Sequence, residues 1–221
     1  RVTEKLLAAV SQPLTIQRRA ITPNISVGIS LFPRDGRKSE VLLKNADIAL
    51  YQAKASGRST YRVYSREMRA GLEARRKMVD ALSAAVANDR IEVAFQPQVS
   101  LRDGSHVGFE ALARWRHNGT DVPPSDFIAG AEETGLIIDL GWRVMRKSVE
   151  MVRNLRRREL LAGTVAVNIA AAQLKQPEFP TMVQQLLDEH GLQPGDLEIE
   201  LTENILLHKD GNRISEALQT F

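Results

Sequence analysis

Residues 108–115 read Gly-Phe-Glu-Ala-Leu-Ala-Arg-Trp, and this stretch decides which fold we expect. Because successive side chains of a β-strand point to opposite faces, alternating residue types separate the two faces of a strand. One face is apolar and runs from Phe109 to Trp115, whereas the other carries Glu110 and Arg114. The stretch therefore predicts a strand with one side against a hydrophobic core and the other equipped for chemistry.

Two later segments repeat this pattern. The segment 164–169 alternates apolar side chains with Asn168 on the opposite face. The segment 197–202 alternates them with Glu198 and Glu200. We therefore expect three strands, each of which presents a polar side chain near the same edge of one sheet.

The surrounding sequence alternates strand and helix patterns, which is typical of a parallel sheet covered by helices. Asp103-Gly104 separates two apolar runs and predicts a hairpin between strands at 91–101 and 106–115. We expect an α/β fold in the form of a partial (β/α) TIM-like barrel. A whole barrel needs roughly 250 residues, and residues 78–221 supply about half of that. The expected helices cover residues 125–133, 138–158 and 178–190.

Glu110, Asn168 and Glu200 would meet at the mouth of such a barrel, where barrel enzymes hold their reactive groups. A carboxylate is costly to bury there unless it is paired or bound to a cation. All three side chains offer hard oxygen atoms, which favour Mg²⁺ or Mn²⁺ over Zn²⁺. Arg114 would supply the forked guanidinium that suits a phosphate. The pattern predicts a divalent-metal site beside a phosphate-binding residue.

A less specific interpretation of these residues stays open. Each could be a strand-end side chain of an open sheet, solvated or paired with a neighbouring lysine or arginine. Three polar residues in register on successive strands favour the metal site over this alternative. Glu198 lies earlier on its strand, so it suits a structural ion pair as well as a metal.

The composition is that of an ordinary globular protein, with 43% hydrophobic and 26% charged residues. There is no cysteine, which excludes disulfides and thiolate metal sites and favours a reducing, cytoplasmic location. No apolar run is long enough to span a membrane, so we expect no membrane contact by this segment. Because the chain starts without Met or a signal segment, a longer protein could still be anchored upstream. The net charge of +3 suits an anionic small ligand.

Arginines are frequent in the segment 143–158, a pattern that nucleic-acid or anionic-lipid binding would also produce. Met145, Val149, Val152 and Leu155 form an apolar stripe at helical spacing, which places the arginines on the solvated face of an outer helix. No basic patch interleaved with aromatic residues accompanies them. We therefore expect no nucleic-acid partner.

The same segments resemble the EAL domain of cyclic di-GMP signalling proteins over about residues 78–221. Residues 110–112 are Glu-Ala-Leu themselves. The resemblance implies that the partial barrel is of the EAL type. The other matching motifs follow in the family's order: Phe95-Gln96-Pro97-Gln98-Val99, Ser125-Asp126-Phe127-Ile128, 131–137, Val167-Asn168-Ile169 and 198–203.

This resemblance implies a catalytic centre. Glu110, Asn168 and Glu200 resemble three of the metal ligands, and the two glutamates are implied to be catalytic. Glu203 resembles the glutamate that holds the following catalytic loop. The implied reaction is hydrolysis of one phosphodiester of cyclic di-GMP to linear pGpG, with metal ions that neutralise developing charge.

The resemblance also implies substrate contacts, and it reveals that several motifs of the family's site are missing from this sequence. Gln96, Leu112 and Arg114 resemble residues that contact cyclic di-GMP, Arg114 through a phosphate. The Asp-Asp-Phe-Gly loop of the family, and its later Lys, Glu and Gln, are missing. We therefore expect no turnover by the 221-residue chain alone, and either pairing with a second copy through its bare sheet edge or a continuation of the protein beyond this sequence.

Residues 1–66 resemble the C-terminal part of an α+β GGDEF domain, and 67–77 read as a helical linker. Residues at the positions of Lys54 and Arg58 contact GTP phosphates in that family. Because the GGDEF signature itself is absent, we favour the simpler interpretation that both cations complement a helix dipole. The matching motifs are 25–29 and 46–58.

Two alternative functions of the whole protein stay open. It could be a non-catalytic receptor that binds cyclic di-GMP and relays the signal to a partner. It could also be a tandem protein that acts mainly as a diguanylate cyclase. Hydrolysis of cyclic di-GMP is favoured over both, since Glu110, Asn168 and Glu200 are all present.

Overall fold

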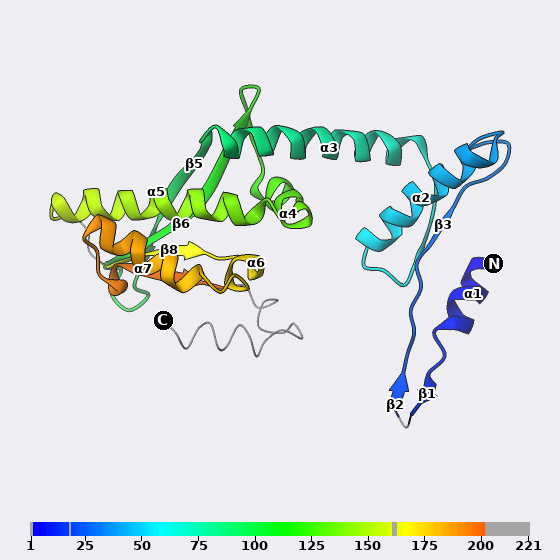
Figure 1. Cartoon of the computed structure of the whole chain (residues 1–221), viewed down its shortest axis with the longest axis horizontal. Coiled ribbons are helices and arrows are strands. Elements are labelled where there is room, and N and C mark those ends of the chain that lie inside the picture. The colour runs from blue at the N-terminus through cyan, green and yellow to red at the C-terminus, as the bar shows by residue number, and fades with distance from the viewer. Residues whose placement is uncertain (1, 18, 161–162, 202–221) are drawn as a thin grey trace. The chain divides into compact units, whose positions relative to one another are not determined.

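A computed structural model of the chain describes residues 2–17, 19–160 and 163–201 (Figure 1). The chain divides into two compact units, Arg1–Lys77 and Met78–Phe221. The division falls within helix α3, which runs from Arg66 to Ala87. The segment 67–77, which reads as a linker, is therefore part of one continuous helix.

The first unit contains two separate strand pairs. β1 and β2 form an antiparallel hairpin that the sequence pattern did not predict, and every residue of both strands is exposed. β3 and β4 pair in parallel, and α2 packs against them with Ile48 and Ala49 buried beside Tyr64. The elements are α1 (Val2–Val10), β1 (Leu14–Ile16), β2 (Arg19–Ile21), β3 (Val27–Ile29), α2 (Ser39–Ala55) and β4 (Tyr61–Val63).

The second unit is built on a five-stranded sheet in the order β5-β6-β8-β9, with β7 also paired to β6. β5 and β6 form the antiparallel hairpin predicted around Asp103-Gly104, and Gly104 has a φ of +71° that glycine adopts without strain. The elements are β5 (Ile91–Val99), β6 (His106–His117), β7 (Thr120–Val122), α4 (Pro124–Thr134), α5 (Ile137–Arg157), β8 (Thr164–Asn168), α6 (Ala171–Leu174), α7 (Phe179–His190), a 3₁₀ turn (Pro194–Asp196) and β9 (Leu197–Glu200).

The strands β6, β8 and β9 run parallel, with α4 and α5 between the first two and α6 and α7 between the last two. Within the described residues the sheet does not close on itself. The unit is therefore an α/β fold with a partial barrel, which confirms the prediction. The short strand β7 was not predicted.

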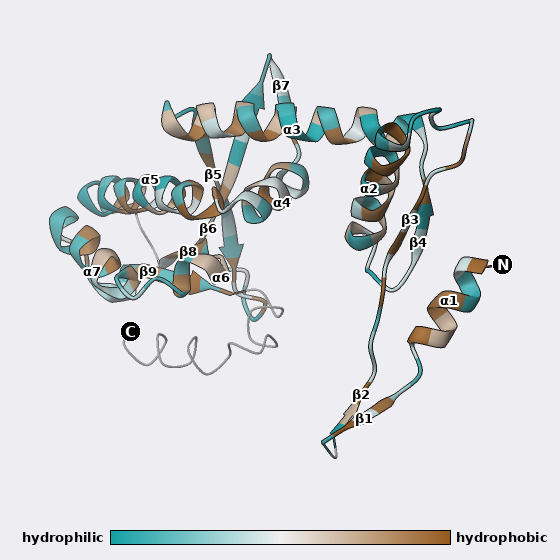
Figure 2. Cartoon of the chain, turned by 45° about the vertical axis from the view of Figure 1, so that its right-hand side comes forward, coloured by the Kyte–Doolittle hydropathy of each residue, from teal (hydrophilic) through white to brown (hydrophobic). Residues whose placement is uncertain are grey.

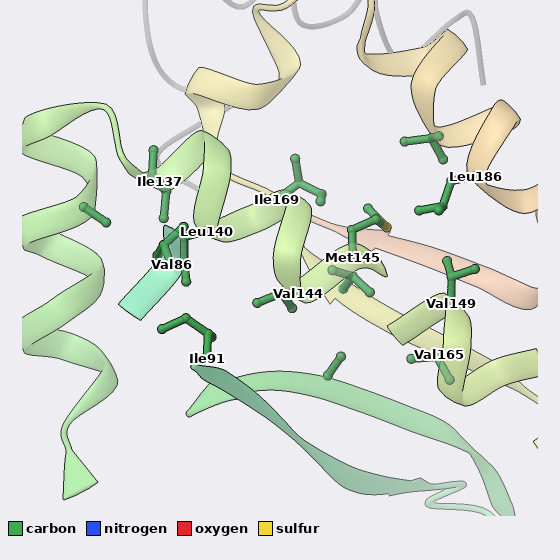
Figure 3. Packing of buried hydrophobic residues seen from close by; sticks show 14 of the residues in the cluster. Val86, Ile91, Ile137, Leu140, Val144, Met145, Val149, Val165, Ile169 and Leu186 are labelled. Atoms are coloured by element: carbon green, nitrogen blue, oxygen red, sulfur yellow. The ribbon is translucent and has the colours of Figure 1, made fainter. Parts of the chain in front are cut away.

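The main hydrophobic core lies between helix α5 and this sheet (Figure 3). Val144, Met145 and Val149 of α5 are buried near Val165 of β8. Hydrophilic and hydrophobic residues follow one another along α5 in Figure 2, as in an amphipathic helix that covers a sheet. Among the described residues, no helix combines the length and the apolar character that a membrane crossing needs.

Several basic side chains of α5 form ion pairs within the second unit. Arg143 and Lys147 lie 3.7 and 3.3 Å from the carboxylate of Asp89. Arg156 pairs with Asp196, a side chain that is largely buried. These contacts fit the interpretation of α5 as an outer helix of the barrel.

β6 and β8 approach each other closely at Gly108. A Cβ atom at this position would lie 2.4 Å from the backbone oxygen of Thr164. Gly163, just before β8, has a φ of +93° and faces the carbonyl of Val107. Side chains at either glycine would separate the strands, so the two glycines permit the register in which Glu110 lies opposite Ala166.

Candidate active site

The strand register brings polar side chains of β6, β8 and β9 onto one face of the sheet. Glu110 lies opposite Ala166 on β8, and Asn168 lies opposite Glu200 on β9. Directly paired residues of neighbouring strands point to the same face, and so do residues two apart on one strand. Glu110, Asn168 and Glu200 therefore share a face, the one that the sequence pattern assigns to polar groups.

Hydrogen bonds connect these side chains. Asn168 Nδ2 donates to Glu110 Oε1 at 2.8 Å, and the Asn168 side chain also hydrogen-bonds to Glu200. Gln98 Nε2 of β5 lies 3.5 Å from Glu200 Oε1. Because β6 and β8 separate β5 from β9 in the sheet, the Gln98–Glu200 contact requires the sheet to curl, as the wall of a barrel does.

Burial and nearby negative charges disfavour the ionised form of Glu200. Burial raises the pKa of Glu200 above the ordinary glutamate value, and the charges of Glu110 and Glu198 raise it further. Hydrogen bonds from Gln98 and Asn168 act in the opposite direction and do not cancel this rise. A carboxylate in such surroundings is stabilised by a nearby cation.

Glu110, Asn168 and Glu200 fit a hard divalent cation. They are two carboxylates and one amide, and Mg²⁺ and Mn²⁺ prefer oxygen ligands of these kinds. A cation beside both carboxylates would offset the repulsion that raises the pKa of Glu200. Across residues 2–17, 19–160 and 163–201, no three histidine, cysteine, aspartate or glutamate side chains gather into a metal site. Among the described residues these three side chains are the ligands on offer, and Mg²⁺ commonly completes its coordination with water or substrate oxygens.

Glu198 acts on this cluster through its charge. It lies opposite Ala166, and its Oε2 accepts a hydrogen bond of 3.3 Å from Thr164 Oγ1. Its negative charge contributes to the raised pKa of Glu200.

Gln96 of β5 and Arg114 of β6, which the resemblance implies as substrate contacts, lie on strands of the same sheet. Gln96 is exposed and lies opposite Glu110 in the antiparallel register of β5 and β6. Arg114 is exposed, and its Nη1 donates to the neighbouring carbonyl oxygen of Ala113 at 2.9 Å. Glu203 lies outside the described residues.

A pocket of about 600 Å³ adjoins the cluster at Asn168. Its walls come from β6, α4, α5 and the turn that joins β8 to α6. Its volume and mostly apolar walls, with a few polar groups, are typical of small-molecule sites. The residues that line it include Leu112, Arg114, Ile128, Glu132, Val144 and Asn168.

Sequence reasoning missed two glutamines near this site. Gln98 lies two residues after Gln96 on β5, so strand alternation could have placed it on the same face. Gln173 is only 1% exposed and belongs to α6, a helix of four residues that the pattern did not predict. Nothing in the sequence distinguishes Gln173 from a surface glutamine.

Glu200→Gln is expected to stabilise the 221-residue chain in metal-free buffer at pH 7.5. A glutamate with a raised folded-state pKa loses stability as the pH rises through that pKa, whereas glutamine stays neutral. The variant should therefore unfold at higher urea concentration than the wild type at pH 7.5 in EDTA. The difference in stability between variant and wild type should vanish near pH 4. This pH lies below the ordinary glutamate pKa of 4.5, so the wild-type Glu200 is mostly neutral there, as glutamine is. A variant less stable than the wild type at pH 7.5 would contradict this account.

Comparison with known families assigns the second unit. The sequence model of the EAL domain matches residues 79–221. The chain belongs to the EAL domain family. The sequence model described as diguanylate cyclase, GGDEF domain, matches residues 1–60 ahead of the EAL domain. Both matches agree with the resemblance seen in the sequence motifs.

Relatives of this EAL domain chain include much longer signalling proteins. One named uncharacterized signaling protein, from Caulobacter vibrioides, is 39% identical over 97% of this chain and 26% of its own length. The cyclic di-GMP phosphodiesterase NbdA of Pseudomonas aeruginosa is 35% identical over 94% of this chain and 27% of its own length. The chain thus spans about a quarter of the length of these relatives.

A solved structure supports the EAL fold. The PaMucR phosphodiesterase in complex with c-di-GMP matches with a TM-score of 0.60 and 26% identity, over 65% of this chain and 60% of that one.

Proposed function

We propose that the whole protein hydrolyses cyclic di-GMP to linear pGpG in a metal-dependent reaction. The cluster of Glu110, Asn168 and Glu200 beside a pocket lined by Arg114 carries this proposal. Two comparisons support it: NbdA is named a cyclic di-GMP phosphodiesterase, and the PaMucR structure is named a phosphodiesterase in complex with c-di-GMP.

We propose that the cluster binds the divalent metal cofactor. Glu110, Asn168 and Glu200 would hold Mg²⁺ or Mn²⁺, which when bound polarises a phosphate oxygen and lowers the pKa of a water molecule. Gln98 would keep the Glu200 carboxylate in place through the contact at 3.5 Å. Glu203 is proposed to hold a following catalytic loop, as the family resemblance implies.

We propose that the residues around the cluster bind the substrate. Arg114 would turn its guanidinium from the Ala113 carbonyl to a phosphate and donate two parallel hydrogen bonds. Leu112, in the pocket wall, would contact the nucleotide. Gln96, opposite Glu110, would bind substrate beside the cluster.

The 221-residue chain is proposed to be inactive by itself. Its described sheet is open, and an open sheet edge leaves unpaired backbone groups that favour association with another chain. We therefore propose that the isolated chain tends to form a homodimer. We also propose a cytoplasmic location, because a chain without cysteine suits a reducing compartment.

A hydrolysis assay tests these proposals. The whole protein, incubated with cyclic di-GMP and Mn²⁺, is expected to form pGpG, and EDTA should abolish the product. The 221-residue chain should form none. Binding of cyclic di-GMP by the whole protein without hydrolysis would favour the receptor function, whereas absence of binding would refute both functions.

A further inference from the structure

The pocket beside Asn168 has a buried amide group in its wall. Gln173 lines this pocket and is 1% exposed. Its Nε2 atom is buried and has no hydrogen-bond partner within the described residues. Because burying a donor without an acceptor is unfavourable, an unpaired donor in a pocket wall points to an acceptor on a ligand.

The orientation of this amide is set by the turn that follows β8. Gln173 Oε1 accepts a hydrogen bond of 3.1 Å from the backbone N–H of Ala170. A flipped amide would place its NH₂ group against that N–H, so the oxygen must face Ala170. Nε2 is therefore the atom that is left without a partner among the described residues.

Helix α5 makes room for the amide at Gly141. A Cβ atom at this position would lie 2.4 Å from Cδ, Nε2 and Oε1 of Gln173. The Gln173 carboxamide therefore lies directly against the backbone of α5. Held between this helix and the turn at Ala170, the donor is preorganised, which lowers the entropic cost of binding a ligand.

The rest of the wall indicates what kind of acceptor fits. Ile128, Leu140, Val144 and Ile169 line the same pocket and are apolar. Arg114 and Asn168 line the same pocket and can meet a phosphate, whereas Gln173 offers a single neutral donor. A phosphate held by that neutral donor alone would be poorly compensated, whereas a flat base with a neutral carbonyl loses little hydration. The apolar part of the pocket therefore suits a purine base better than a phosphate.

We infer that Gln173 forms the floor of a base subsite and donates a hydrogen bond to the carbonyl oxygen of a guanine. This inference rests on the proposed function and adds to it the group that recognises the base. Adenine has an amino group where guanine has that carbonyl, so Gln173 would favour guanine over adenine.

Replacement of the amide tests this role in the whole protein. Gln173→Met removes the donor and keeps a side chain of similar length. We expect KM for cyclic di-GMP to rise about tenfold and kcat to stay within about twofold, because a base contact is the same in the ground and transition states. The Kd for cyclic di-GMP, measured in EDTA, should rise by the same factor. The ratio of the Kd for cyclic di-AMP to the Kd for cyclic di-GMP should fall.

Two further variants keep the test decisive. Gln173→Leu also removes the donor and introduces no charge, so it should weaken binding even if the Met variant does not fold. Ser148→Ala is the matched control, since it removes a buried hydroxyl of α5 that bonds the Val144 carbonyl at 2.8 Å and should leave KM unchanged. Unchanged affinity and base preference in the Gln173 variants would overturn the inference. A wild-type protein that neither binds nor hydrolyses cyclic di-GMP would overturn the proposed function, and the inference with it.

Discussion

Glu110→Gln is expected to lower the rate of cyclic di-GMP hydrolysis by the whole protein at least about 100-fold. Glutamine is similar in size to glutamate and keeps a side-chain oxygen that can accept the hydrogen bond from Asn168 Nδ2. In the wild type this bond to Glu110 Oε1 is 2.8 Å long. It removes one of the two negative charges that face the proposed cation. With Glu200 as the remaining carboxylate of the cluster, the affinity for Mg²⁺ or Mn²⁺ should fall, and with it the turnover.

The measurement is pGpG formation at increasing Mn²⁺ concentrations. Glu189→Gln is the matched control, because it makes the same chemical change at an exposed position on α7 and should leave the rate unchanged. The variant should also lose the rise in melting temperature that Mn²⁺ gives the wild type. Full activity of Glu110→Gln would refute the role of this cluster as the metal centre.

Gly108→Ala is expected to reduce the free energy of unfolding of the chain by about 2–3 kcal/mol. The added Cβ would lie 2.4 Å from the Thr164 backbone oxygen, and backbone atoms yield less readily than a flexible side chain. β6 and β8 would have to separate at this point. Because Glu110 and Asn168 belong to these two strands, the hydrogen bond between them should weaken, and hydrolysis by the whole protein should fall.

Urea denaturation of the 221-residue chain measures the first effect. Gly71→Ala provides the comparison, because a Cβ at this exposed position of α3 meets nothing within 4 Å. Alanine also favours helices over glycine, so this control should gain roughly 0.5–1 kcal/mol. If Gly108→Ala were as stable as the wild type, the close approach of β6 and β8 would not limit the residue at this position.

Much of the second unit could be predicted from local patterns. The strands β6, β8 and β9 and the face on which Glu110, Asn168 and Glu200 lie follow from alternation, a property of neighbouring residues. Helix α5 followed from its apolar stripe in the same way. The exposed hairpin of β1 and β2 could not be found like this, since none of its residues is buried and burial is what produces the alternation.

The contacts between distant segments had no local signal. Gln98 reaches Glu200 only because the sheet curls and brings β5 toward β9. Gln173 became a candidate only once its amide was seen to be buried against Gly141. Alternation could place Gln98 on the polar face but not beside Glu200, and Gln173 does not differ in type or spacing from many glutamines on protein surfaces.

Residue order by itself determined the class of fold, the family and the polar face of each strand, because these depend on periodicity and motifs within short segments. The tertiary structure decided which polar groups touch: the register at Gly108, the curl that joins Gln98 to Glu200, and the unpaired amide of Gln173. The physical reason is that register and curvature result from packing between segments up to about a hundred residues apart, and no short stretch of sequence contains that packing.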